Sequence, residues 1–230
     1  MTGRTRRAVP ALLLTGSIIY LAGEAVSAAA WTAPAYSYAR NWISDLGSTT
    51  RGRFQGRLID SPLHDVMNAA FITQGVLLAV GVVLLARTAR GPLRTAVGVV
   101  GVVVGAGYLL IGTFHGSASA ATDGTLAWHF AGAGLAILGG NALAVVLGIH
   151  WWRDPSTRGL GHASAPLGVL GLIGTAVLLA TMGSDVPAGL IERIAVYPIV
   201  LWQLRVAVEF LRPGSPFRIA AVQRATEVVR

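Results

Sequence analysis

Six apolar stretches, each about as long as a membrane-spanning helix, constrain the fold of this chain more than any other feature. They cover residues 8–30, 63–86, 95–114, 126–149, 166–184 and 190–211. Roughly 20 residues of helix cross a bilayer core, and hydrocarbon offers no hydrogen-bonding partner to a non-helical backbone. The sequence therefore predicts an all-α membrane protein, with six transmembrane helices in a single polytopic domain over residues 1–230.

The composition argues against a soluble fold and excludes some kinds of chemistry. Hydrophobic residues make up 53% of the chain, charged residues make up 12%, and the mean hydropathy is +0.63. An average soluble domain carries about 25% charged residues. The chain has no cysteine, which excludes disulfides, thiol catalysis and zinc sites that use cysteine. The net charge of +8 comes from scattered arginines without a basic face, so no nucleic-acid partner is predicted.

The distribution of arginines predicts the orientation. Four of them lie in the long loop 31–62, at positions 40, 51, 53 and 57. Twelve lie in segments expected on the opposite side: Arg4, Arg6, Arg7, Arg87, Arg90, Arg94, Arg153, Arg158, Arg212, Arg218, Arg224 and Arg230. By the positive-inside rule, both termini are cytoplasmic and loop 31–62 is extracytoplasmic. We expect a multi-pass protein of the cell (inner) membrane.

Loop 31–62 is predicted to fold back as a cap over the mouth of the bundle. The segment 42–46 contains a tryptophan, an isoleucine and a leucine, which is too apolar for a free loop. Its serine and aspartate, with Asn41 before them, can satisfy backbone groups in turns. Ser61 is expected to cap the second helix, with Pro62 in its first turn.

Ionisable side chains gather at the predicted outer end of the bundle. A charge in hydrocarbon needs a partner, a cavity or a function, so several charges at one depth predict a polar site. Histidines and carboxylates together supply the groups for general acid–base catalysis. We expect six of them to line a cavity that opens toward the outer leaflet: Glu24, Asp45, His64, Asp65, His115 and His129.

Within this site, His129 is the predicted acid–base group. It lies in the first turn of a helix that faces the loop, and Asp45 or Asp65 is its predicted orienting carboxylate. Glu24 lies well inside the first helix, so it must be neutral or paired, with a histidine or Arg193 as its partner. Five residues are expected at the rim of the pocket: Asn41, Ser44, Asn68, Glu192 and Arg193.

Structural roles and metal binding are alternatives for the same residues. A carboxylate in the first turn of a helix, such as Asp65 or Glu192, is stabilised by the helix dipole and needs no catalytic role. Histidines and carboxylates also suit a metal site, but the chain contains no HExxH or HxxxH pair. The sequence therefore assigns neither a metal nor another cofactor.

Three motifs point to a known family. They are NWISDLG at 41–47 with Ser61-Pro62 and Asn68, GTFH at 112–115, and HFAGAGLAILGGN at 129–141. Together they resemble the DUF998 family of bacterial and archaeal integral membrane proteins. The resemblance implies a six-helix membrane domain and covers most of the chain, but it supplies no reaction, since the function of the family is not established. It marks these motif positions: Asn41, Ser44, Asp45, Asn68, His129 and Asn141.

Three classes of function remain open. The first is a membrane-embedded enzyme that acts on a lipid or isoprenoid, with the outer histidines and carboxylates as acid–base groups. The second is a small transporter or permease coupled through Glu24. Against it, the chain has no detectable repeat, and the predicted helices, interpreted as lacking polar residues through their inner half, offer no obvious path. The third is a non-catalytic lipid-binding or partner protein. The enzyme ranks slightly ahead, and the expected partners are the bilayer and a lipid or isoprenoid ligand.

Overall fold

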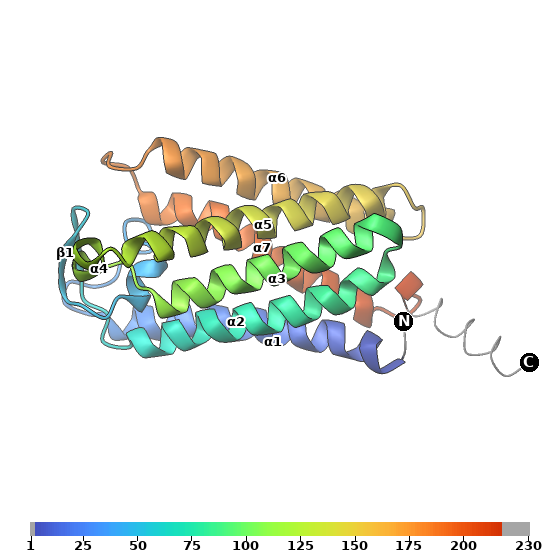
Figure 1. The fold of residues 1–230 in the computed structure, drawn as a ribbon, viewed down its shortest axis with the longest axis horizontal. Helices are drawn as coiled ribbons and strands as arrows, with labels where there is room; N and C mark the ends of the chain where they lie inside the picture. The colour runs from blue at the N-terminus through green and yellow to red at the C-terminus, as the bar shows by residue number, and fades with distance from the viewer. Residues whose placement is uncertain (1–2, 218–230) are drawn as a thin grey trace, which may run out of the picture.

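The computed structural model describes residues 3–217 and contains six long helices (Figure 1). They are α1 (Gly3–Ala30), α2 (His64–Leu85), α3 (Gly91–Thr113), α5 (Leu126–Trp152), α6 (Arg158–Ala180) and α7 (Ala188–Leu211). Each is long and apolar enough to cross a membrane. The prediction of six long apolar helices is confirmed, and by their length and composition the chain is a multi-pass membrane protein. Of the arginines in the charge argument, Arg218, Arg224 and Arg230 lie outside the described residues.

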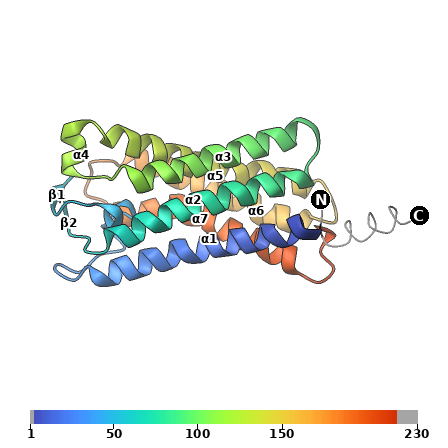
Figure 2. The ribbon, with the colours of Figure 1, turned by 60° about the horizontal axis from the view of Figure 1, so that its bottom comes forward.

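The helices form a closed ring. Each packs on the next long helix in sequence, and α7 returns to pack on α1. Figures 1 and 2 show which parts of the chain lie at each end of the bundle. One end, here called the arginine-rich end, holds the start of α1, the end of α7 and the α2–α3 and α5–α6 connections. The opposite end, here called the loop end, carries loop 31–63, the short helix α4 (Ala118–Asp123) and the connection 181–187.

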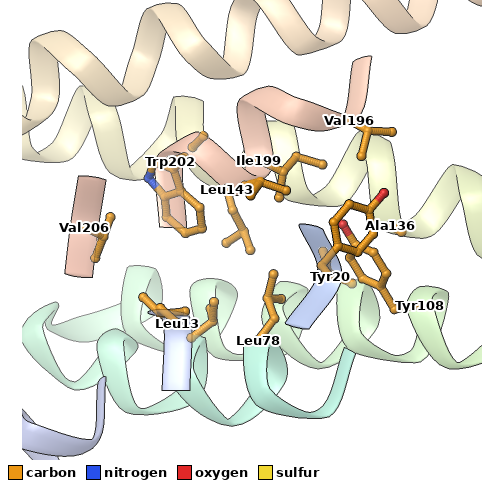
Figure 3. Packing of buried hydrophobic residues seen from close by; sticks show 14 of the residues in the cluster. Leu13, Tyr20, Leu78, Tyr108, Ala136, Leu143, Val196, Ile199, Trp202 and Val206 are labelled. Carbon is orange, nitrogen blue, oxygen red and sulfur yellow. The ribbon is translucent and has the colours of Figure 1, made fainter. Parts of the chain in front are cut away.

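Apolar side chains from all parts of the ring meet along its axis. Leu13 of α1, Leu78 of α2, Leu143 of α5 and Trp202 of α7 are buried there (Figure 3). The outward faces of the same helices are also apolar, as Ile173 on α6 illustrates. Helices that are apolar all round are typical of membrane spans, so the packing agrees with the composition.

Glycines let neighbouring helices approach closely, as two contacts illustrate. A Cβ atom on Gly107 of α3 would lie 2.7 Å from the carbonyl oxygen of Gly132 on α5, and one on Gly132 would lie 2.8 Å from that of Gly107. Between α5 and α6, a Cβ atom on Gly148 would lie 2.8 Å from the Cα of Ala165. Small residues allow such backbone contacts where no hydrophobic effect drives helix association. The α5–α6 contact lies toward the arginine-rich end.

Loop 31–63 is folded and packs on the bundle. It contains a 3-10 helix (Ser44–Gly47) and an antiparallel hairpin of β1 (Gly52–Phe54) and β2 (Arg57–Ile59). The hairpin turns at Gln55 and Gly56, whose φ values of 48° and 79° suit a two-residue turn between twisted strands. Four apolar side chains of the loop are buried: Trp31, Ile43, Leu46 and Ile59.

Two local predictions differ from the structure. Ser61 does not cap α2, which begins at His64 after Leu63; the Ser61 hydroxyl instead donates a hydrogen bond of 2.6 Å to the carbonyl of Leu46. The fifth span was expected at 166–184, whereas α6 starts at Arg158 and contains Pro166. The hydropathy of the first two turns of α6 is lowered by arginine, histidine and serine, so the apolar stretch begins later than the helix.

Candidate functional site

An apolar cavity of about 260 Å³ lies at the loop end of the bundle. All six long helices and loop residues 42–44 contribute to its walls. Tyr20 and Tyr108, which pack edge to face with ring centroids 6.1 Å apart, line it and belong also to the buried core (Figure 3). Beside the tyrosines and Trp42, the polar lining side chains are Ser44, His129, Thr175 and Glu192. The arrangement is that of an apolar ligand site with a few polar groups.

The cavity opens sideways, between α5 and α6. Its exposed apolar lining residues are Phe130 and Leu138 on α5, and Leu179 and Met182 at the end of α6 and just beyond it. Figure 1 shows α6 diverging from α5 toward the loop end. Since this flank of a membrane-spanning bundle faces acyl chains, the opening leads into the bilayer.

His129 is held in one orientation on α5. The ring is buried, and its Nδ1 atom lies 2.8 Å from the carbonyl oxygen of Phe114. Because that oxygen can only accept a hydrogen bond, Nδ1 carries a proton, and in the neutral ring Nε2 is the acceptor. Nε2 has no hydrogen-bond partner among residues 3–217. The prediction that Asp45 or Asp65 orients His129 is wrong, since a backbone carbonyl does so.

Glu192 is a buried carboxyl group in the second turn of α7, not in the first turn as expected, and lies in the cavity wall itself. One of its oxygens accepts a hydrogen bond from the backbone N–H of Ile43 in the loop. Within the described part of the chain, Glu192 forms no ion pair. A buried carboxyl group without a cationic partner is a candidate for function, because its structural role alone does not offset the desolvation.

Glu24 is paired with Arg193, one of the two partners expected for it. The Nε and Nη2 atoms of Arg193 lie 3.0 and 2.7 Å from one carboxylate oxygen of Glu24, and the hydroxyl of Tyr197 donates to the same oxygen at 3.0 Å. Arg193 also donates to the hydroxyl of Tyr36 and to the carbonyls of Tyr38, Asn41 and Gly189. The pair therefore joins α1, α7 and loop 31–63, and hydrogen bonds hold both the carboxylate and the guanidinium in place.

Asp45 is engaged in a second ion pair, within the loop. Arg57 of β2 donates to both of its oxygens, at 2.9 and 3.0 Å, and the backbone N–H of Trp42 donates at 2.9 Å. The guanidinium of Arg57 also stacks over the Trp42 ring, 4.6 Å from its centroid. Asp45 thus fastens the hairpin to the 3-10 helix.

The other predicted site residues lie at the loop end but do not line the cavity. His64 Nε2 is 3.5 Å from a carboxylate oxygen of Asp65, whose side chain is 93% exposed. His115 is partly buried after α3, and burial lowers its pKa below the ordinary value. Asn68 donates to the carbonyl of Gly47 at 2.9 Å. Within residues 3–217, no three His, Asp or Glu side chains are grouped so that they could hold a metal ion.

The structure brings together only part of the predicted set. Of the six candidate catalytic residues, His129 lines the apolar cavity; of the rim residues, Ser44 and Glu192 do so. Whether any of them is catalytic stays a prediction. Sequence reasoning missed Arg57, whose separation of twelve residues from Asp45 gave no signal.

Gln74 and Gln203, two polar residues inside the bundle, were also missed. The amide of Gln74 donates to the amide oxygen of Gln203 at 3.0 Å, and both side chains are fully buried. Asn141, a motif position already named from the sequence, donates to the carbonyl of Ala195 at 2.9 Å and thereby joins α5 to α7. The argument that the inner half lacks polar residues is therefore wrong for Gln203, and a glutamine within a spanning segment was the available signal.

The comparisons with known proteins give one match. The family model described as Protein of unknown function (DUF998) matches residues 14–209. This range contains all three motifs on which the resemblance was based, and it covers most of the chain. No curated protein and no solved structure matches the chain.

Proposed function

The chain belongs to the DUF998 family, and we propose that it is a membrane-embedded enzyme that acts on a lipid or isoprenoid bound in the cavity between α5 and α6. The observation that carries this proposal is the shared lining of one apolar cavity by His129 and Glu192. Both are buried, and neither is engaged in an ion pair within the described residues. Glu24 and Asp45, by contrast, are held by arginines.

His129 and Glu192 are suited to proton transfer because each is positioned by the backbone. The Phe114 carbonyl fixes the ring of His129 and leaves Nε2 as the proton acceptor. The N–H of Ile43 holds one oxygen of Glu192. The apolar walls around them strengthen their electrostatic interaction with a bound reacting group.

The size and opening of the cavity favour an elongated apolar substrate. A volume of about 260 Å³ lies just below the range of roughly 300–1,000 Å³ for pockets that enclose a drug-sized ligand. The cavity therefore holds the reacting part of a lipid, and the remainder passes between α5 and α6 into the bilayer.

Two conservative substitutions test the proposal. In His129→Asn the side-chain amide can still donate to the Phe114 carbonyl, and in Glu192→Gln the amide oxygen can still accept from Ile43. Both changes remove proton transfer while keeping the positioning contacts. His162→Asn, on the exposed face of α6 near the arginine-rich end, is the matched control.

The measurement is an untargeted lipid profile of cells that lack the protein, complemented with each variant. We expect wild type and His162→Asn to restore the profile. His129→Asn and Glu192→Gln should lower conversion by about 10²-fold or more at equal membrane levels, the usual contribution of an acid–base group. Restoration by both site variants, or no lipid difference on loss of the protein, would overturn the enzymatic proposal in favour of transport or lipid binding.

A further inference from the structure

A second cavity of about 930 Å³ adjoins the apolar one and is here called the polar cavity, because charged and amide side chains such as Arg40, Asn41 and Asp185 join its lining. It is formed by loop segment 34–42, hairpin residues 55–58 and the connection between α6 and α7. Trp42, Leu178 and Met182 line both cavities, so they form a shared wall.

The two cavities lie at different depths of the membrane. The apolar cavity is lined by residues inside the spans, such as Ala136 and Ile137 of α5. The polar cavity is lined largely by residues beyond the helix ends, including 181–186 after α6. Residues just beyond the ends of the spans lie at the level of the lipid headgroups. The paired cavities thus follow the layering of one leaflet, with a polar region above an apolar one.

Arg40 is the cation of the polar cavity that an incoming group can recruit. The other arginine there, Arg57, is held by both oxygens of buried Asp45. The Nη1 atom of Arg40 lies 3.5 Å from a carboxylate oxygen of Asp185, and the two side chains are 74% and 97% exposed. An ion pair this exposed contributes at most about 1 kcal/mol to stability, so an anionic ligand can take the place of Asp185. Arginine matches the geometry of phosphate oxygens.

We propose that the two cavities together bind one amphiphile that carries a phosphate headgroup. The phosphate lies against Arg40 in the polar cavity, and the apolar chain passes the shared wall of Trp42, Leu178 and Met182 into the apolar cavity. The inference rests on the proposed function and names the substrate class of that site.

The test compares three probes by native mass spectrometry of the purified full-length protein. Dodecyl phosphate has both halves of the ligand, dodecanol has the chain alone, and inorganic phosphate has the headgroup alone. We expect dodecyl phosphate to bind more tightly than either of the others. Equal binding of inorganic phosphate would identify a free-phosphate site, and equal binding of dodecanol would leave Arg40 without a role; either result overturns the proposal.

Charge variants give effects of opposite sign. Arg40→Gln should weaken dodecyl phosphate binding about tenfold, as expected for a lost charge-assisted hydrogen bond, and leave dodecanol unchanged. Asp185→Asn should strengthen dodecyl phosphate binding, a gain that misfolding cannot produce. Arg51→Gln is the matched control, because Arg51 is an exposed, ion-paired arginine of the same loop that does not line either cavity. The same effect for Arg40→Gln and Arg51→Gln would refute the assignment.

A bulky substitution tests the apolar half. A Cβ atom on Gly134, in the cavity wall, would meet no atom within 4 Å, and the same holds for Gly159 on the exposed face of α6. Gly134→Leu should therefore weaken binding of dodecyl phosphate and dodecanol alike, and Gly159→Leu should weaken neither. His129→Asn and Glu192→Gln should retain binding. If they also restored the lipid profile, enzymatic function would fail while the amphiphile site stood.

Discussion

At the scale of single residues, the buried charges at the loop end fall into two groups. Glu24 with Arg193, and Asp45 with Arg57, tie loop 31–63 to the bundle and to itself. Glu192 has neither a cation nor a second protein donor to its carboxylate within residues 3–217, and it faces a cavity. This division separates the paired side chains from Glu192, which lines the apolar cavity without an ionic partner among the described residues.

Glu24→Gln tests the structural role of the first pair. The variant leaves Arg193 buried without its counter-charge, and loss of one partner of a buried ion pair costs about 3–5 kcal/mol. We expect the free energy of unfolding, measured by denaturant titration in mixed micelles, to fall by about 3 kcal/mol. Arg51→Gln breaks an exposed pair and should cost less than about 1 kcal/mol. Equal small losses in both variants would show that the Glu24 pair does not hold the bundle together.

The sequence could identify some of these partners and not others. Glu24 and Arg193 are both expected near the same membrane depth, and an unpaired charge there is unfavourable, which made the pairing predictable. The partner of Asp45 depends on a hairpin of two three-residue strands, which is too short to leave a periodic pattern. The direction in which His129 points depends on how α5 is rotated about its axis. A helix that is apolar on all sides carries no sequence pattern that predicts this rotation.

At the scale of elements, hydropathy located the six helices because each must supply a continuous apolar surface to the bilayer. It did not locate the ends that extend beyond the hydrocarbon, as the start of α6 at Arg158 shows. The short helix α4 was also missed, since its six residues lie in a connection and form no membrane-length apolar stretch. Glycine content indicated tight packing, but only the structure shows which helices the glycines bring together.

Two glycines on α5 make that packing testable. A Cβ atom on Gly132 would lie 2.7 Å from the Cβ of Leu110 and 2.8 Å from the carbonyl oxygen of Gly107, so Gly132→Ala must push α3 and α5 apart. Overpacking of this kind costs about 1–3 kcal/mol of unfolding free energy. Gly134→Ala, two residues further on, enters open space and should cause no loss. If both variants unfolded at the same denaturant concentration as wild type, the α3–α5 contact would be looser than described.

At the scale of the whole molecule, both cavities lie at the loop end, and the arginines of the α2–α3 and α5–α6 connections lie at the other. The positive-inside rule places the arginine-rich end in the cytoplasm, which remains our prediction for the orientation. In this orientation, the proposed amphiphile site lies on the side of the outer leaflet.

The absence of cysteine from the chain makes this orientation simple to measure. Thr49→Cys places a thiol at the loop end, and Ser156→Cys places one at the arginine-rich end; both positions are exposed. A membrane-impermeant maleimide should label Thr49→Cys in intact cells and Ser156→Cys only after permeabilisation. The reverse pattern would invert the topology, and the cysteine-free wild type supplies the background.

Under the proposed function, the sideways opening between α5 and α6 makes the concentration of substrate within the leaflet the relevant one for this protein. A ligand that reaches the cavity from among acyl chains never crosses water, so its supply is set by its mole fraction in the leaflet and by lateral diffusion. Dilution of the substrate with inert lipid should therefore slow turnover at constant bulk concentration. Adding more membrane of the same composition should leave the turnover rate per protein molecule unchanged.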